Sequence, residues 1–380
     1  MWSPSAPRGD SADVTGAILV AGVVLALVGV IIHVAGSRVI YAVLPPVVTG
    51  AVVMLIGFNL APVVATVYWP QDQWVALIVM VGVITMSVGL RGFAGRISIF
   101  LGLVLGYALS WVFDRVFGRI TSPTGAGEVT EHFRVDWSQV SEASVLGFPP
   151  ETLFVDGAEV PGWHAPSFSV AFTLLVLPAV IALVAENAGH VKAVAEMTGA
   201  DLDPVMGRAI AADGVGTVIA TSVGGSPTTT YAENIGVMAA TRVYSTAAYY
   251  VAALVAILFG FSPLFGAVVS ATPGGVLGGI TVVLYGMIGL LGAKIWKENG
   301  VDFGNPVNLV PVAAGIIIAI GNTSLQVTEE FVLSGIALGT IVTIGAYHLA
   351  RAVAPEHLRG AADSPSVVLG KERTDPPGSA

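Results

Sequence analysis

Two acidic side chains lie in stretches that are otherwise apolar, and their neighbours suit binding and proton transfer. Glu186 follows a long apolar run in ALVAENAGH, and His190 comes four residues later, on the same face of a helix. An ionised side chain at the centre of a bilayer costs at least about 2.5 kcal/mol and is seldom kept without a function. The pair could therefore share or relay a proton. Alternatively, both lie near a helix end and simply reach headgroup water.

The second carboxylate, Glu233, belongs to the segment GGSPTTTYAENIGVMAATR at 224–242. The glycines and the proline of this segment break a helix, the threonines favour extended backbone, and a short helix can restart near Ala232. We therefore predict one broken helix with a short strand near 226–231. Broken helices mark substrate sites near the midplane of secondary transporters, because protein or a watery cavity must satisfy their free backbone groups. An extramembrane turn with Glu233 on the surface is the alternative.

Together these groups suit a small planar solute that carries both N–H donors and carbonyl acceptors. Carboxylates accept hydrogen bonds from imide N–H groups, and the free N–H groups of a helix N-terminus donate to carbonyls. Leaving such a group unpaired in a buried site costs about 1–3 kcal/mol, which gives selectivity. Uracil has these groups, although the chemistry alone does not single it out.

The elements that position these residues are membrane helices. Of the 380 residues, 54% are hydrophobic and only 11% are charged, and the mean hydropathy is +0.82, so the main solvent is lipid. We predict an all-α integral membrane protein with about eleven transmembrane segments. The expected segments are 15–35, 42–65, 73–90, 97–118, 167–191, 208–223, 231–242, 244–264, 276–295, 306–321 and 331–350.

Several classes of function find no support in the sequence. The absence of cysteine removes disulfides, zinc–thiolate sites and iron–sulfur clusters, and the six histidines show no pairwise ligand spacing. We therefore expect no metal and no cofactor. Nucleic acid binding has no basic patch to depend on. An enzyme is not expected, because no Ser–His, Asp–Asp or His-rich constellation lies within the segments.

Basic residues predict the orientation in the membrane. If the C-terminus is cytoplasmic, alternating the segments puts twelve of the 16 Lys and Arg residues inside and leaves four outside. The acidic loop 119–166 is then extracytoplasmic, and the tail 352–380, whose composition is typical of disorder, is cytoplasmic. We expect a multi-pass protein of a bacterial cytoplasmic membrane.

A short internal repeat predicts two related halves. Pro45 and Gly50 open the second segment, and Pro273 and Gly278 open the ninth with the same spacing. Transporters are often built from inverted repeats. If these segments correspond, equivalent helices are seven positions apart, a complete molecule holds fourteen, and three are absent from the front. The expected divisions are an N-terminal segment at 1–14, four spans of the first repeat at 15–118, and seven spans of the second repeat at 167–351.

The segment around Glu233 resembles the nucleobase-cation symporters of the nucleobase/ascorbate transporter family, and within it the bacterial uracil permeases. The signature of that family is Gln or Glu, then Asn-x-Gly, four residues, and Thr-Arg. This chain has Glu233, Asn234, Gly236, Thr241 and Arg242 at these positions. Uracil carriers have Glu at the first position, whereas xanthine and urate carriers commonly have Gln. The likeness covers about 15–350, and the pattern of Glu186, Gly189 and His190 resembles the eighth helix of the family.

The resemblance implies a fold and a set of roles. The family fold has fourteen spans in two inverted repeats of seven, arranged as a core domain and a gate domain and usually dimeric, and the first span here resembles the fourth. By motif, Glu186 and Glu233 would hydrogen-bond the base, beside Tyr231, and the backbone around Ala232 would meet a carbonyl. His190, with the two carboxylates, would couple a proton. Tyr285 would be the aromatic residue that the gate domain turns toward the substrate, or else a packing tyrosine.

The function implied is proton-coupled uptake of a nucleobase, uracil by preference, with sodium left open as the coupling ion. An anion transporter or channel of the same fold is a rival, although a pair of carboxylates repels anions. An inactive truncated membrane subunit is the other rival.

Overall fold

Helices dominate the structure, because backbone polar groups in lipid must pair within their own segment. The computed structural model describes residues 11–36, 38–123, 129–148, 152–155, 158–177, 179–328 and 332–362. Among these residues, six helical stretches are long and apolar enough to cross a membrane. They are Ser11–Ala35 (α1), Pro46–Gln71 (α3, α4 and the turns that follow), Ser98–Phe117 (α7), Val170–Thr198 (α9 and α10), Gly274–Glu298 (α15) and Gly335–Val353 (α17).

The remaining predicted segments also form helices, but shorter ones. They are α5 (Gln73–Gly89), α11 (Met206–Thr221), α12 (Ala232–Thr241), α16 (Pro306–Ile320), and α13 (Thr246–Gly260), which meets α14 (Pro263–Ser270) at 87°. A helix of 16 residues covers about 24 Å, less than the hydrocarbon thickness of about 30 Å. By length and composition, six of the eleven expected segments reach the length of a span in the described chain, or seven if the bent pair counts as one, and the others are shorter helices.

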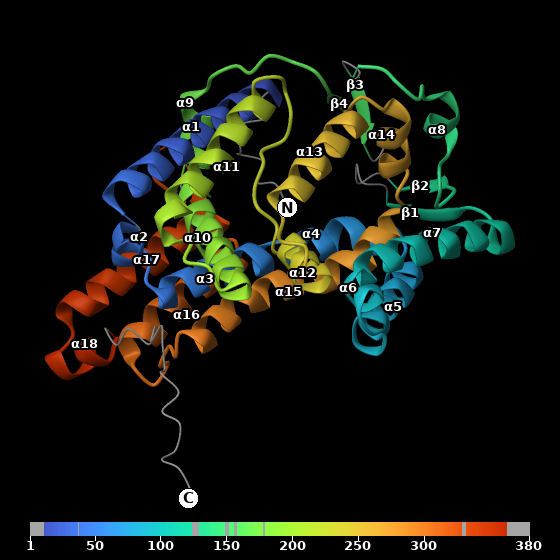
Figure 1. Ribbon diagram of the computed structural model, residues 1–380. Helices are drawn as coiled ribbons and strands as arrows, with labels where there is room; N and C mark the ends of the chain where they lie inside the picture. The colour runs from blue at the N-terminus through green and yellow to red at the C-terminus, as the bar shows by residue number, and fades with distance from the viewer. Residues whose placement is uncertain are drawn as a thin grey trace, which may run out of the picture.

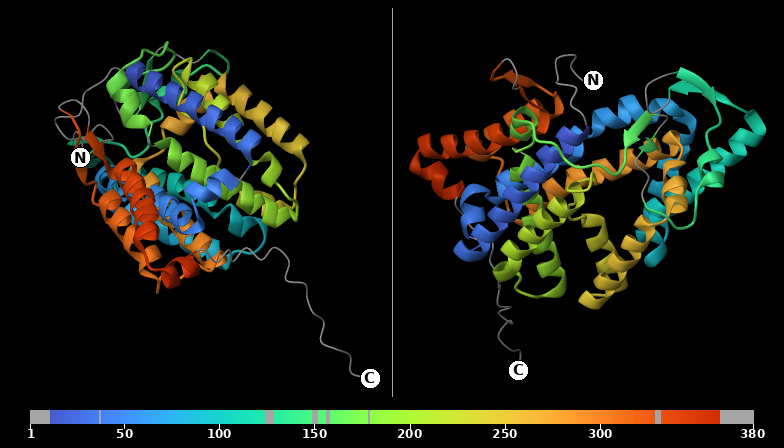
Figure 2. Two further views of the ribbon diagram at one scale, coloured as in Figure 1. Left: turned by 90° about the vertical axis from the view of Figure 1, so that its left-hand side faces the viewer. Right: turned by 90° about the horizontal axis from the view of Figure 1, so that it is seen from above.

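The helices pack in two groups (Figures 1 and 2). The α1–α11 group contains α1, α9, α10 and α11. The α3–α15 group contains α3, α5, α7, α15, α16 and α17. The two groups touch where α10 lies against α3 and α17. Helix α12 packs against α10 and also contacts the short helix α6 (Phe93–Arg96), which joins α5 to α7, so α12 lies between the groups.

Glycines let the central pair of each group pack closely. Gly22 and Gly214 bring α1 against α11, and a Cβ atom at Gly214 would overlap the backbone of Ala26. In the same way Gly292 of α15 meets the backbone of α3 at Gly50. Small residues at helix interfaces are the usual means of close packing in membranes.

Helices α3 and α15 are also the two segments that the internal repeat pairs. Each begins after an extended proline, Pro45 (φ −63°, ψ 162°) and Pro273 (φ −61°, ψ 136°). They run antiparallel, since residues later in α3 meet residues earlier in α15. Antiparallel packing is what inverted repeats require, and the equivalence of the two halves stays a prediction.

Buried apolar side chains hold both groups together. One cluster includes Leu25 of α1, Val48 of α3, Met206 of α11 and Tyr347 of α17. A second cluster joins α5 to α15 through three valines of α5 and Val276. The first cluster crosses the boundary between the groups, so they are packed against each other at one side.

The fold is mostly rather than entirely α-helical. The described residues form three antiparallel hairpins: β1 (Ile120–Pro123) with β2 (Val129–His132), β3 (Thr152–Val155) with β4 (Ala158–Pro161), and β5 (Ser324–Gln326) with β6 (Val332–Ser334). Two of them, with the short helix α8 (Ser138–Glu142), lie in the region expected to be a loop. Strands can form there because two short segments joined by a turn satisfy each other's backbone groups.

The predicted disorder of the tail is wrong for its described part. Helix α18 (Glu356–Ala362) follows α17, and Leu358 packs against the main apolar cluster. Asn305 Nδ2 donates to the Leu358 carbonyl at 2.8 Å, and Arg359 Nε donates to the Ala354 carbonyl at 2.6 Å. These bonds fix the segment despite its polar composition. Residues 363–380 and 1–10 lie outside the described chain.

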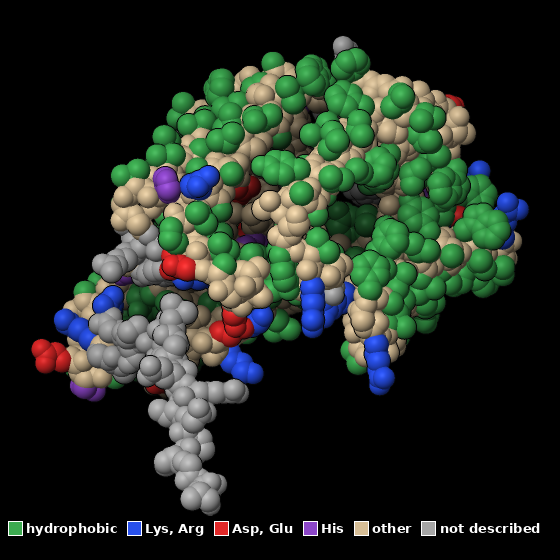
Figure 3. Space-filling model, in the orientation of Figure 1, with side chains coloured by type: hydrophobic (Ala, Val, Ile, Leu, Met, Phe, Trp, Pro, Cys, Tyr) green, Lys and Arg blue, Asp and Glu red, His purple; other side chains and the backbone are tan. Residues whose placement is uncertain are grey.

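The surface fits a lipid environment. Large hydrophobic side chains are exposed along several helices, and none of the residues of α13 is buried. Figure 3 shows these side chains covering the upper and right-hand parts of one face, with Lys and Arg at its lower edge. Near the centre of that face the surface is hollowed, and acidic and histidine side chains are visible inside the hollow.

Candidate functional site

The predicted interruption of the helix is present. Helix α11 ends at Thr221, α12 begins at Ala232, and residues 225–231 form neither helix nor strand. The short strand expected near 226–231 is therefore wrong. In its place, the side chain of Thr217 pairs with the backbone of Thr228: its hydroxyl donates to the Thr228 carbonyl at 3.1 Å and accepts from the Thr228 N–H at 3.2 Å. The side chain of Thr217 on α11 thus satisfies the backbone N–H and carbonyl of Thr228, as a neighbouring strand would.

A chain of hydrogen bonds joins α10, the broken segment and α11. His190 Nδ1 lies 2.6 Å from Thr230 Oγ1, and Thr230 Oγ1 donates to Asn187 Oδ1 at 3.2 Å. Asn187 Nδ2 in turn donates to Asp213 Oδ2 at 2.8 Å. Since Thr230 uses its proton toward Asn187, its oxygen accepts from His190, which places a proton on Nδ1 of the imidazole. The network connects an imidazole to a carboxylate through two neutral side chains.

Asp213 is the residue that reasoning from the sequence missed. It lies in α11, within the apolar run that was expected to cross the membrane, and it also accepts from Thr228 Oγ1 at 3.4 Å. The criterion that singled out Glu186, a carboxylate inside an apolar segment, applies equally to Asp213. Asp213 lies in the run AIAADGVG, outside the family signature at 233–242.

Glu186 lies one helical turn before His190 on α10 and is partly buried. Its carboxylate therefore starts from the same face of the same helix as the imidazole. The prediction that the two residues lie on one face of a helix agrees with the structure of α10, and the exchange of a proton between them stays a prediction.

Glu233 and Ala232 are in the first turn of α12, and their side chains lie outside the described part of the chain. The residue before this helix, Tyr231, has extended backbone (φ −115°, ψ 122°) and provides no side-chain cap. The first backbone N–H groups of α12 therefore make no capping hydrogen bond to the side chain of Tyr231. The Tyr231 ring itself is 62% exposed. Nearby, Thr229 Oγ1 is buried without a hydrogen-bond partner among the described residues.

Tyr285 lies in a different place from the network. It lines a mostly apolar cavity of about 450 Å³, together with Phe58, Ala61, Trp69 and Thr281. This cavity belongs to α3, α15 and the turns after α3, and its lining includes no residue of α10 or of the broken segment. The structure thus brings His190, Thr230 and Asp213 together, whereas it leaves Tyr285 on the wall of the α3–α15 group.

Comparison with known proteins identifies the kind of protein that carries this site. The family model of the xanthine/uracil permeases, described as "Permease family", matches residues 3–328. The chain is 40% identical to a protein named "Putative pyrimidine permease RutG" from Escherichia coli (strain K12), over 87% of this chain and 69% of that protein. It is 33% identical to the uracil permease of Bacillus caldolyticus, over 88% and 74% of the two chains. It is 32% identical to the uracil permease of Escherichia coli (strain K12), over 87% and 72%.

The match of the family covers most of the chain, and the three relatives named are 32–40% identical over 87–88% of it. The chain therefore belongs to the xanthine/uracil permease family and is a multi-pass membrane transporter rather than an enzyme.

Proposed function

We propose that this protein carries a nucleobase, uracil by preference, across the membrane together with a proton. The observation that carries the proposal is the broken helix, whose polar residues join a histidine and a carboxylate inside an apolar bundle. The names of the relatives support a pyrimidine, and Glu at the first position of the family signature supports uracil.

The base would bind beside the N-terminus of α12. Glu186 and Glu233 would accept hydrogen bonds from the ring N–H groups, and the N–H groups around Ala232 would donate to a carbonyl. Tyr231 would close one side, and the buried hydroxyl of Thr229 is a further polar group in reach of this segment. A base that lacks one of these groups would leave a buried partner unpaired, at a cost of about 1–3 kcal/mol.

The coupled proton would use the network that begins at His190. The imidazole and Asp213 are the two titratable ends of a chain whose middle members, Thr230 and Asn187, orient them. Glu186, one turn away, would exchange the proton with the imidazole when the base binds. Protonation and binding are then linked, because both act on the same face of α10.

Alternating access would come from movement between the two groups of helices. The α1–α11 group with α12 and α13 would form the core domain, and the α3–α15 group would form the gate domain. Helix α12 lies between them, so a shift of either group changes which side of α12 is open. Tyr285, on the wall of the gate domain, would meet the base when the groups close. We also propose a cytoplasmic C-terminus and a homodimer.

Replacing Glu233 with Gln tests this assignment. In proteoliposomes that hold the purified chain, we expect Glu233→Gln to abolish uptake of radiolabelled uracil or to shift preference toward xanthine, because an amide donates where the carboxylate accepts. Glu298→Gln is the control, since Glu298 lies at the far end of α15, 42% exposed and paired with Lys294. Uptake and selectivity that match the unmodified chain would refute the role of Glu233.

A further inference from the structure

Arg134 is a buried charge in the loop that follows α7. Its Nε donates to Asp72 Oδ2 at 2.7 Å, and its Nη1 donates to Asp114 Oδ1 at 3.1 Å. The three side chains are only 8–11% exposed. Asp72 begins α5 and Asp114 lies near the end of α7. One guanidinium therefore holds together the two free ends of the α5–α7 hairpin.

The carboxylates of this cluster also fix the backbone around them. Asp72 Oδ1 accepts from the N–H groups of Trp74 and Val75, which caps α5. Asp114 accepts from the N–H groups of Arg134 and Val135 at 3.0 and 3.1 Å. Both helix ends and the loop are thus tied to one ion cluster, and without Arg134 two desolvated carboxylates would repel each other.

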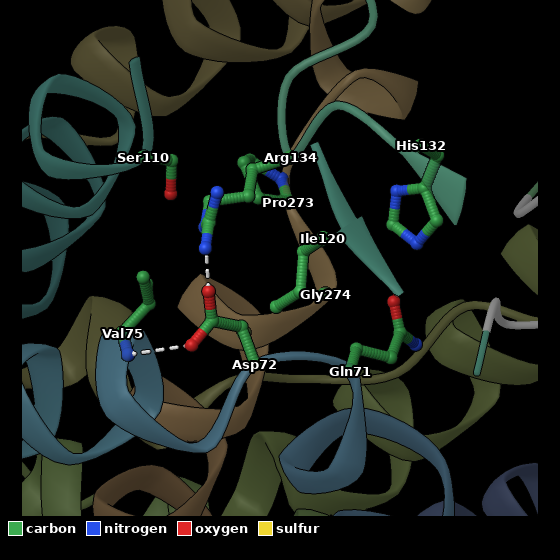
Figure 4. Close-up of a pocket in the computed structure, with 10 residues that line it drawn as sticks. Gln71, Asp72, Val75, Ser110, Ile120, His132, Arg134, Pro273 and Gly274 are labelled. Atoms are coloured by element: carbon green, nitrogen blue, oxygen red, sulfur yellow. Dashed lines mark hydrogen bonds and ion pairs between the residues drawn. The ribbon is translucent and has the colours of Figure 1, made fainter. Parts of the chain in front are cut away.

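Figure 4 shows that α15 begins at the same place. Pro273 and Gly274 face the cluster across a cavity of about 20 Å³, which is roughly the space of one water molecule. Ser110 Oγ of α7 lines this cavity and is buried without a hydrogen-bond partner among the described residues. The start of α15 therefore lies beside the cluster that joins the ends of α5 and α7.

Further along the same loop, residues 144–148 are attached to the corner between α13 and α14. The Leu264 N–H donates to the Ser144 carbonyl, and the Gly147 N–H donates to the Phe261 carbonyl, each at 3.0 Å. The ring of Phe148 packs edge-to-face on Phe261 with centroids 5.8 Å apart. Figure 1 shows α8 of this loop beside α14 and above α7. Residues 129–148, which we call the strap, thus connect the α5–α7 hairpin to the helix that follows α12.

We propose that the strap, clasped by Arg134, sets the position of the α13–α14 corner relative to the α5–α7 hairpin, and that Arg134 is a positioning residue for transport. The proposal rests on the proposed function. The α5–α7 hairpin has the Arg134 cluster at one end and α6 at the other, and α6 contacts α12. If the Arg134 ion pairs are lost, the clasped end of the hairpin opens and α6, at its other end, shifts. The movement of helices around α12 then changes, while the residues that bind the base stay in place.

Arg134→Met tests the clasp in proteoliposomes. We expect the maximal rate of uracil uptake to fall about tenfold, with the Kd for uracil within twofold of the unmodified chain. Arg134→Lys keeps a charge and should restore part of the rate. Arg115→Met is the matched control, because Arg115 is exposed at the same end of α7 and lies over Trp111. An unchanged rate in Arg134→Met, or equal losses of rate and binding, would overturn the proposal.

A cross-link tests the other end without relying on the Arg134 variants. The sequence has no cysteine, so Ser144→Cys with Leu264→Cys adds the only thiols, at two residues whose backbones are joined by a hydrogen bond of 3.0 Å. We expect the disulfide to form and uptake to stay within twofold, since the strap remains on the corner throughout transport. Uptake that stops on oxidation and returns on reduction would show that the strap must leave the corner during transport, and would overturn the proposal.

Cross-linking also separates the two proposals. If the unmodified chain takes up no uracil, the proposed function fails. The rate of disulfide formation still measures how closely the strap is held to the α13–α14 corner. We expect Arg134→Met to slow that rate several-fold, because the strap loses its clasped end. An equal rate in both backgrounds would contradict the clasp whatever the transported solute is.

Discussion

Replacing Thr230 with Val tests whether the bridge between α10 and the broken segment prepares the binding site. The change keeps the shape of the side chain and removes the oxygen that joins His190 to Asn187. Asn187 is only 1% exposed, so its carbonyl oxygen cannot turn to solvent. A buried acceptor left unpaired costs about 1–3 kcal/mol, and the segment would relax to avoid that cost.

The magnitude follows from this penalty. Binding must restore the segment, so the Kd for uracil should rise by about 5- to 150-fold, at about 1.4 kcal/mol for each factor of ten. Equilibrium binding of radiolabelled uracil to purified protein measures it. Thr198→Val is the control, because Thr198 lies exposed on the same helix and donates only to the Val194 and Ala195 carbonyls of that helix. A lower melting temperature with an unchanged Kd would refute the reasoning, since the bridge would then be structural only.

Three further changes test other parts of the account. Asp213→Asn removes a charge but keeps an acceptor for Asn187, so uracil binding should stay within about threefold while proton-driven accumulation falls about tenfold; loss of binding alone would contradict this. His190→Ala should weaken proton-driven accumulation more than binding, and equal losses in both would count against a coupling role. Gly292→Ala should lower the melting temperature, because a Cβ there meets the backbone of α3, whereas Gly286→Ala has open space and should not; equal effects would show that close packing of α3 on α15 is unimportant.

The parts of the structure that the sequence predicts are those with local causes. Gly224, with φ of +83°, and Pro227 close after it disfavour continued helix through local backbone chemistry, so the interruption before Ala232 could be placed to within a few residues. Apolar runs likewise mark helices directly. Glu186 and His190 share a face because their spacing is that of one helical turn.

What the sequence does not predict depends on contacts between distant residues. The Thr228 backbone pairs with Thr217, and no pattern in 226–231 distinguishes that from strand pairing. The role of Asp213 becomes apparent only from its hydrogen bond with Asn187, which lies on another helix. The order of the tail depends on Asn305 and on apolar contacts of Leu358, which its polar composition hides. The strap is also of this kind, since Asp72 and Arg134 are 62 positions apart.

Coupled transport by the reconstituted chain is the most direct test of the account. Proteoliposomes holding the purified protein would be given radiolabelled uracil with an inward proton gradient, and external pH would be followed at the same time. We predict that uracil accumulates, that its entry carries protons inward, and that Glu233→Gln abolishes both. Accumulation of uracil that does not depend on the proton gradient, or transport of an anion in place of uracil, would contradict the account.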